Sequence, residues 1–408
     1  MKLLSLLAIG LAVLGAETAR AESPTALRIG IMDDMSGVYK DIQGPGDVVA
    51  AQMAVADYGG KVLGRRIEVL SGDLQNKVDV GLALARRWYD EDGVAAIFGL
   101  GNSAVALAVQ ELSRQKNRID VVTSAGTADL TGKACSPLGV HWTYDTYALA
   151  KGTATAVVKA GGDRWWFITA DYAFGHSLEN NAAHFVKASG GQVLGASRAP
   201  LGQADYSSYL LQAQTAHANV IGIASAGTDM VNTVKQMAEF GLMRQGVRAA
   251  ALLALVTDIH AIGLPTAQGL YFTEAFYWDQ SPETRAFSKR FQAAFGKPPT
   301  SFQASMYGAV MHYLKAVQAA GTVEAKAVME KMKAMPIDDF MTSHGYIRAD
   351  GRVIRNMYLL QAKTPAESHG EWDLAKVVAT IPGEQAFRPL SEGGCPLVHG
   401  ANNAHSGN

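Results

Sequence analysis

The stretch Val94-Ala-Ala-Ile-Phe-Gly-Leu-Gly-Asn-Ser-Ala-Val-Ala-Leu-Ala-Val-Gln110 predicts a buried strand, a tight turn and a helix in succession. Its first five residues are apolar, glycine interrupts the run at Gly99 and Gly101, and Ser103 opens an apolar helix. The N–H groups of a first helical turn have no partner inside the helix, so we expect an anion site at this turn. The same glycines, with Ala104, match the dinucleotide fingerprint G-x-G-x-x-A.

Strands and helices alternate along the chain on both sides of this stretch. Leu27–Met32 and Arg66–Ser71 are predicted strands before it, and the alternation starts again after Tyr144. This pattern predicts an α/β fold with two doubly wound parallel sheets. A ligand cleft is expected where the carboxyl ends of the two sheets face each other. After Pro282 the pattern becomes helical, and the tail after Pro365 is predicted to be irregular.

The first residues predict a secretory signal peptide that covers residues 1–21. An apolar run follows Lys2, and Ala19-Arg-Ala21 is a small-x-small cleavage site. The run is shorter than the roughly 20 residues that cross a bilayer. No cysteine follows the site to carry a lipid. We therefore expect an exported, periplasmic protein that starts near Glu22.

Composition and cysteine content limit the class of protein further. The chain has 408 residues, of which 48% are hydrophobic, and its formal net charge of −1 gives no support for a nucleic-acid partner. In an oxidising compartment the two cysteines, Cys135 and Cys395, are expected to form a disulfide that holds the C-terminal tail. The alternative is two free thiols.

Signatures of catalysis are lacking in the sequence. It contains no G-x-S-x-G elbow, no H-E-x-x-H pair and no spaced metal cluster. The dinucleotide interpretation fails because that fingerprint follows the first strand of its domain, whereas the turn at Gly99 follows the third. We expect no cofactor, no metal and no enzymatic activity.

The loops that follow the predicted strands carry hydroxyl, aromatic or acidic residues, and six of them would meet in the cleft. They are residues 33–39, 99–103, 124–127, 171–175, 225–229 and 257–260. Ser103, Thr127 and the backbone N–H of Ala125 together suit a small carboxylate. For each residue alone, helix capping or turn stabilisation is the alternative.

Several motifs together resemble the periplasmic substrate-binding proteins of ABC importers, in the Leu/Ile/Val-binding class. The resemblance covers about Ala26 to Ala362 and rests on Met35-Ser-Gly37, Ala54-Val-Ala-Asp57 with Gly59-Gly60, the 99–103 turn, Ser124-Ala-Gly-Thr127, Asp171-Tyr-Ala-Phe-Gly175, Gln236-Met-Ala-Glu-Phe-Gly-Leu242 and the helix with Tyr307 and Tyr313. It implies two lobes joined by a three-crossing hinge that closes on a ligand. Lobe one would be 26–144 plus 277–343, lobe two 145–276 plus 344–362, and the tail 363–408 would be partly tethered to lobe one.

The resemblance also implies roles for individual residues. Ser103, Ala125 and Thr127, flanked by Asn102 and Ser124, would hold a ligand carboxylate. The family's aromatic positions correspond to Phe174 and to Ala226, where the small side chain leaves space. Asp258 would pair with the ammonium of an amino acid. Apart from the resemblance, we expect aromatic surface in the cleft from Tyr39, Tyr172, Phe174, Tyr277 and Trp278.

Two further segments resemble a branch of the family that is linked to aromatic acids such as hydroxybenzoates and phenylpropenoates. They are Asp34-Met-Ser-Gly-Val-Tyr39 and Glu274-Ala-Phe-Tyr-Trp-Asp279. We therefore expect a monomeric solute-binding protein that delivers a small aromatic carboxylate to an inner-membrane ABC permease. The alternatives are a branched-chain or other amino acid as ligand, and an exported enzyme or sensory module of the same fold.

Overall fold

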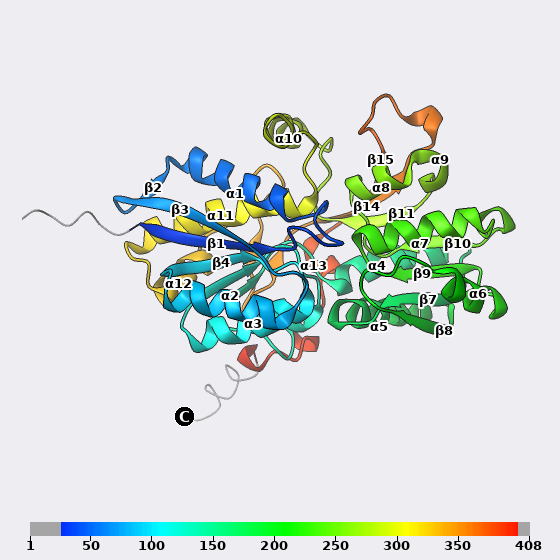
Figure 1. Cartoon of the computed structure of the whole chain (residues 1–408), viewed down its shortest axis with the longest axis horizontal. Coiled ribbons are helices and arrows are strands. Elements are labelled where there is room, and N and C mark those ends of the chain that lie inside the picture. Colours follow the sequence, from blue (N-terminus) through cyan, green and yellow to red (C-terminus); the bar gives the residue numbers. More distant parts are fainter. Residues whose placement is uncertain (1–25, 399–408) are drawn as a thin grey trace, which may run out of the picture.

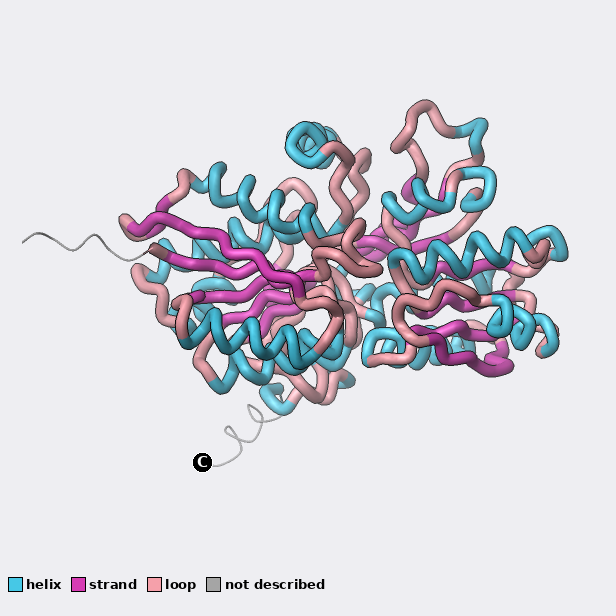
Figure 2. Tube along the Cα trace, in the orientation of Figure 1, coloured by secondary structure: helices cyan, strands magenta, loops and turns pink. Residues whose placement is uncertain are grey.

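The computed structural model describes residues 26–398, which form two α/β lobes that lie side by side (Figure 1). In each lobe the strands form an inner layer and helices lie on both sides of it (Figure 2). The predicted signal peptide, residues 1–21, lies outside the described residues.

The first lobe is built on a six-stranded sheet. Its strands are β1 (Leu27–Asp33), β2 (Lys61–Val62), β3 (Arg65–Asp73), β4 (Val94–Gly99), β5 (Ile119–Val122) and β6 (Gly139–His141). The order across the sheet is β2-β3-β1-β4-β5-β6, and every pair except β2 with β3 is parallel. This sheet confirms the predicted doubly wound arrangement.

Helices cover both faces of this sheet, which explains why β4 is apolar throughout. The helices on the sheet are α1 (Pro45–Tyr58), α2 (Val78–Asp90), α3 (Ser103–Gln115) and α11 (Ser301–Ala320), while α10 (Pro282–Phe295) packs on α1 and α12 (Ala325–Ala334) on α11. Successive β4 side chains point to opposite faces: Ile97 packs in the cluster around Trp88 of α2, and Phe98 meets Tyr313 of α11 edge to face at 5.5 Å. The helices after residue 282 thus complete the first lobe.

The second lobe has a four-stranded parallel sheet. Its strands are β7 (Arg164–Ala170), β8 (Gln192–Ala199), β9 (Val220–Ala224) and β10 (Arg248–Ala251). Their order is β10-β9-β7-β8. Its helices are α4 (Thr146–Lys159), α5 (Ala173–Ala188), α6 (Ser207–Thr215), α7 (Gly227–Glu239), α8 (Val256–Ile262) and α9 (Leu264–Ala267).

The order of the strands in each sheet determines where the ligand cleft lies. In the first lobe β1 lies between β3 and β4, and in the second β7 lies between β8 and β9. The chain therefore leaves these neighbouring strands toward opposite faces, and a crevice opens at their carboxyl ends. The loops after β1 and β4 meet the loops after β7 and β9 at this crevice.

A third, antiparallel sheet joins the lobes and corrects one expectation. It contains β11 (Tyr271–Glu274), β14 (Met357–Ala362) and β15 (Ala375–Ile381). The tail after Pro365 is thus not wholly irregular. Most of β15 is solvent-exposed, so its sequence lacks the apolar alternation that reveals a strand, and its order comes from pairing with β14. The predicted hairpin at Asp350-Gly351 is confirmed as β12 (Tyr346–Ile347) and β13 (Val353–Ile354).

The predicted disulfide is present. Cys135 and Cys395 are bonded, with Cα atoms 5.6 Å apart. The bond attaches the segment that follows α13 (Gly383–Ala386) to the loop before β6 of the first lobe. The tail therefore contacts both lobes, through β15 on one side and the disulfide on the other.

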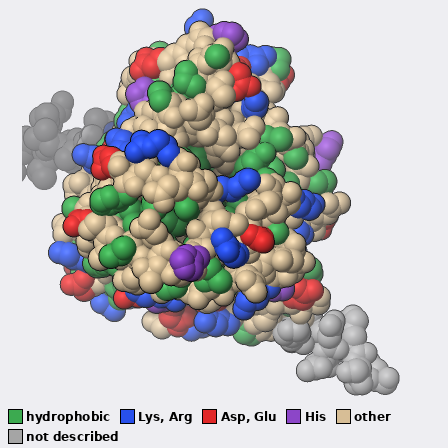
Figure 3. All heavy atoms as spheres, turned by 90° about the vertical axis from the view of Figure 1, so that its right-hand side faces the viewer, with side chains coloured by type: hydrophobic (Ala, Val, Ile, Leu, Met, Phe, Trp, Pro, Cys, Tyr) green, Lys and Arg blue, Asp and Glu red, His purple; other side chains and the backbone are tan. Residues whose placement is uncertain are grey.

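The described residues contain no helix with the length and hydrophobicity needed to span a membrane. Within residues 26–398 there is also no group of three or more His, Cys, Asp or Glu side chains placed to hold a metal ion. On the face seen in Figure 3, basic, acidic and apolar side chains are interspersed. This distribution agrees with the nearly balanced charge of the sequence.

Candidate ligand-binding site

The turn after β4 lies at the crevice of the first lobe, and Asn102 shapes it. The side-chain Oδ1 of Asn102 accepts hydrogen bonds from Ala104 N (3.0 Å) and Val105 N (3.2 Å) at the start of α3. These are two of the N–H groups that we expected to be free for an anion. Asn102 therefore caps the helix and does not line the cavity, and Ser103 is the residue of this turn that offers a side-chain hydroxyl.

Ser103 is buried and contacts the neighbouring loop. Its Oγ accepts a hydrogen bond from Thr127 N at 3.2 Å. The hydroxyl of Thr127 accepts from Asp129 N (3.4 Å) and caps a short 3-10 helix, Ala128–Thr131. Thr127 thus holds Ser103 through its backbone, while its side chain has the capping role that was the alternative expectation.

A narrow cavity lies between the two lobes beside Ser103. Seven of the predicted residues line it: Tyr39, Ser103, Ser124, Ala125, Tyr172, Phe174 and Ala226. The empty space between the lining atoms, counted up to the mouth, is about 250 Å³. The volume open to the centre of a water molecule is only about 10 Å³, close to what one water needs, so the walls must move apart before a ligand can enter.

Asp258 and Tyr277 lie elsewhere. Asp258 is buried in α8, where its Oδ2 accepts a hydrogen bond from Leu255 N at 3.0 Å, and it borders a separate groove. The hydroxyl of Tyr277 accepts from Leu374 N (3.3 Å) and Ala375 N (3.1 Å). The structure therefore brings neither side chain to the cavity, because one caps a helix and the other anchors the start of β15.

The floor of the cavity is the segment after β5, and buried polar side chains hold it in place. The Tyr144 hydroxyl donates to Ser124 O at 2.8 Å. Nε2 of His141 lies 2.8 Å from Ala125 O. Burial, with the nearby Arg352 guanidinium, holds the pKa of His141 well below its usual range, so the ring is neutral. A carbonyl only accepts, so Nε2 carries the proton and donates it.

Two acidic side chains, Asp33 and Asp47, are buried beneath this floor. A Cβ atom on Gly99 would lie 2.2 Å from Asp33 Oδ2, and the Ser124 hydroxyl donates to Asp47 Oδ2 at 3.1 Å. Burial raises the pKa of Asp33 well above its usual range, and the neighbouring Asp47 carboxylate raises it further. Burial raises the pKa of Asp47 to about 7. The pair therefore keeps at least one proton in neutral solution, which reduces the negative charge behind Ser103 and Ser124.

Aromatic side chains form the walls. Tyr39 of the first lobe and Tyr172 of the second share a hydrogen bond between their hydroxyls at 2.7 Å, across the crevice. Tyr144 stacks on Phe302 with ring centroids 5.2 Å apart and an angle of 8° between the rings. Burial raises the pKa of Tyr39, Tyr144 and Tyr172, so all three are neutral phenols. Among the described residues that line the cavity there is no Asp, Glu, Lys, Arg or His.

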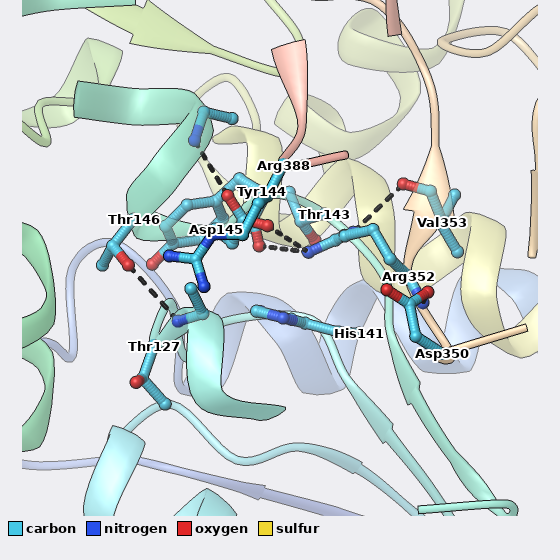
Figure 4. A network of polar contacts seen from close by, with 12 residues as sticks. Thr127, His141, Thr143, Tyr144, Asp145, Thr146, Asp350, Arg352, Val353 and Arg388 are labelled. Atoms are coloured by element: carbon cyan, nitrogen blue, oxygen red, sulfur yellow. Dashed lines mark hydrogen bonds and ion pairs between the residues drawn. The ribbon is translucent and has the colours of Figure 1, made fainter. Parts of the chain in front are cut away.

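A buried arginine supports Tyr144 from the hinge side. Figure 4 shows Arg352 pointing toward the crossing between the lobes, where its Nη1 donates to Tyr144 O at 2.6 Å. The same nitrogen lies 4.0 Å from Asp145 Oδ2, and the guanidinium packs 4.7 Å from the ring centre of Phe387. This network links Tyr144 and Asp145, where the chain first passes from one lobe to the other, to the β12–β13 hairpin and to the tail.

Sequence reasoning missed several lining residues. They are Ile42, Gln43, Tyr144, Leu253 and Phe302, whereas the lining residues Gly101 and Gly126 belong to loops that the sequence placed at the cleft. Tyr144 and Gln43 lie close to segments that the sequence did place at the cleft. Phe302 had no local signal, because it reaches the cavity only when α11 packs against the first lobe, where the Thr300 hydroxyl donates to Ile42 O at 2.8 Å.

Comparison with known proteins identifies relatives over nearly the whole described chain. A family model described as "Periplasmic binding protein" matches residues 26–369. A periplasmic binding protein from Burkholderia mallei is 49% identical, covers 91% of this chain and 99% of its own, and superposes with a TM-score of 0.89. A branched chain amino acid ABC transporter periplasmic ligand-binding protein from Burkholderia xenovorans LB400 is 40% identical with the same coverage, 91% and 99%, and a TM-score of 0.80.

A more distant structure shares the fold. A solute binding protein of an ABC transporter from R. palustris, solved in complex with benzoate, is 21% identical, with a TM-score of 0.80. It covers 91% of this chain and 99% of its own. At this identity the likeness concerns the architecture alone.

Proposed function

The chain belongs to the periplasmic binding protein family, as a solute-binding protein of an ABC transporter, and from that premise we propose that its ligand is a small aromatic carboxylate without an ammonium group. The family is one of binding proteins and not of enzymes. One observation carries the proposal: aromatic rings and hydroxyl groups line the cavity, and none of its described lining residues is charged.

The carboxylate would bind at the floor. Ser103 presents its hydroxyl beside the segment from Ser124 to Gly126, which forms this floor. The retained proton of the Asp33–Asp47 pair favours an anion at this place, because two ionised carboxylates behind the floor would repel it.

An ammonium group would find no carboxylate partner among the described residues of the cavity. Enclosing an unpaired charge costs several kcal/mol, and the described lining supplies no carboxylate. Asp258, the acid that the family resemblance suggested for this role, borders the separate groove. This absence argues against an α-amino acid.

The body of the ligand would lie between aromatic surfaces. Five rings among the described residues line the cavity: Phe174, the hydrogen-bonded pair Tyr39 and Tyr172, and the stacked pair Tyr144 and Phe302. Flat rings gain from edge-to-face and offset contacts with such walls. That the R. palustris protein of the same fold was solved with benzoate is compatible with this proposal.

Capture would proceed by closure of the lobes about the hinge. We assign 26–144 with 277–343 to one lobe, 145–276 with 344–362 to the other, and the tail from 363 to both. In the closed form several hydrogen bonds join the lobes, among them the one between Tyr39 and Tyr172 and the one from Thr228 N to the carbonyl of Val38 at 3.2 Å. The closed protein would then be the form that delivers its ligand to the permease.

An amino acid is the second candidate, because the B. xenovorans relative carries the description of a branched chain amino acid transporter protein. Thermal-shift measurements on the purified mature protein separate the two candidates. Benzoate, hydroxybenzoates and phenylacetate should raise the melting temperature, whereas leucine, isoleucine and valine should not. The reverse pattern would replace our proposal by the second candidate.

Ser103→Ala tests the anchor in the same assay. The loss of one hydrogen bond to a charged group costs about 1.5–3 kcal/mol, so affinity for the best carboxylate should fall roughly 10- to 150-fold. Thr215→Ala, which removes an exposed hydroxyl on α6 of the second lobe, is the control. Equal binding by the Ser103 variant and the control would remove Ser103 from the site.

A further inference from the structure

We infer that Gln43 is a specificity-determining residue, whose side-chain amide hydrogen-bonds to a hydroxyl group on the bound carboxylate. The inference rests on the proposed function and deepens it. The ligand would then carry a hydroxyl group besides its carboxylate, and the Gln43 side chain would recognise that hydroxyl.

Gln43 is buried without any partner for its amide. It is 1% exposed, and neither its Nε2 nor its Oε1 makes a hydrogen bond. It lines the cavity together with Gly101 and Ser103. An unsatisfied buried donor or acceptor costs about 1–3 kcal/mol, so an amide left in this state when the lobes close needs a partner inside the cavity.

The surroundings hold the amide in place. The backbone N–H of Gln43 donates to Tyr39 O at 3.2 Å, which fixes the turn before Gly44. A Cβ atom on Gly101 would lie 1.6 Å from Gln43 Oε1, so the amide lies directly on the backbone of the turn after β4. Any residue other than glycine at 101 would displace it. The amide is thus built into the wall close to the Ser103 anchor.

The chemistry of an amide selects its partner. It offers a donor and an acceptor side by side, whereas a carboxylate can only accept and would leave Oε1 unpaired. A hydroxyl both donates and accepts, so a single hydroxyl can donate to Oε1 and accept one N–H of Nε2. A site built to bond a hydroxyl rejects the analogue that lacks it, because the buried polar group then stays unpaired.

Matched ligand pairs and the variant Gln43→Met, which keeps the length of the side chain but removes the amide, test this inference. Calorimetric titration compares benzoate with 2-, 3- and 4-hydroxybenzoate. The wild type should bind its best hydroxybenzoate about 10- to 100-fold more tightly than benzoate, and the variant should lose most of this preference. L-threonine and L-valine, which differ by a hydroxyl for a methyl, form a second pair that remains informative if no benzoate binds.

Gln303→Met is the control. Gln303 is also 1% exposed in the first lobe with an unpartnered Nε2, but it does not line the cavity. This variant should keep the wild-type preference between the members of each pair. The inference is overturned if the wild type shows no preference for a hydroxyl, or if Gln43→Met weakens both members of a pair equally, as the loss of a bridging water would. Binding of no aromatic acid at all would instead refute the proposed function.

Discussion

Gly227 stands at the start of α7 and faces the carbonyl of Val38 in the other lobe, so a methyl group here should obstruct closure. The φ angle of Gly227 is +56°, and a Cβ atom would lie 2.5 Å from Val38 O. The same oxygen accepts a hydrogen bond from Thr228 N at 3.2 Å. Gly227→Ala therefore places an atom where the closed lobes have no room for it.

The structure separates two costs of this substitution. A positive φ costs a residue with a Cβ about 1–2 kcal/mol whether the lobes are open or closed, so this part lowers overall stability only. The clash and the loss of the Val38–Thr228 hydrogen bond act in the closed form alone. A hydrogen bond contributes about 0.5–1.5 kcal/mol, and the clash adds to it, so affinity should fall by about tenfold or more.

Gly246→Ala is the matched control. Its φ is +89°, and nothing lies within 4 Å of its added Cβ, so it carries the backbone cost without the contact between lobes. Calorimetry with the best carboxylate from the thermal-shift panel gives the affinities, and small-angle scattering at saturating ligand gives the compactness. If Gly227→Ala binds as tightly and becomes as compact as Gly246→Ala, the closure contact assigned to Val38 is incorrect.

Three further substitutions test the acid pair, the disulfide and the contact between the tyrosines. Because burial raises the pKa of Asp47 from 3.8 to about 7, the folded protein binds more protons than the unfolded chain, and wild-type stability should fall as pH rises from about 4 to 7. Asp47→Asn removes this dependence, so the stability difference between wild type and variant in urea titrations should shift between pH 5 and pH 8; a constant difference would contradict the raised pKa. Cys395→Ser should lower the free energy of unfolding by about 2–4 kcal/mol, as should reduction of the wild type, with ligand affinity unchanged because the bond lies outside the cavity. Tyr172→Phe removes the hydrogen bond to Tyr39 and should weaken binding about 2- to 10-fold in calorimetry; an unchanged affinity would mean that this contact does not contribute to closure.

Local sequence patterns were sufficient to predict the site residues that directly follow a strand, because the end of a strand determines where the next residues lie. The apolar run that becomes β4 must be a buried strand, and any residue just after it must lie at the crevice, which places Ser103. The same reasoning placed Ser124, Tyr172 and Phe174, each of which follows a strand. Parallel sheets gather strand ends at one edge, so these residues meet although they are far apart in sequence.

Other features depend on contacts that no local pattern contains. Phe302 reaches the cavity because α11 returns to the first lobe, and β15 is ordered by pairing with β14. Asn102 illustrates a competition: the same side chain could contact a ligand or cap α3, and the two N–H groups within reach favour the cap. The Asp258 carboxylate likewise accepts a hydrogen bond from Leu255 N and caps α8 instead of contacting a ligand.

The central claim is that the cavity accepts a carboxylate and excludes an ammonium group, and one pair of ligands tests it directly. Phenylacetate and L-phenylglycine differ only by the α-ammonium, so calorimetric titration of both isolates the effect of that charge. Because no described lining residue is charged, phenylacetate should bind at least about 100-fold more tightly. Equal affinities, or tighter binding of phenylglycine, would contradict the claim and favour an amino acid as the ligand.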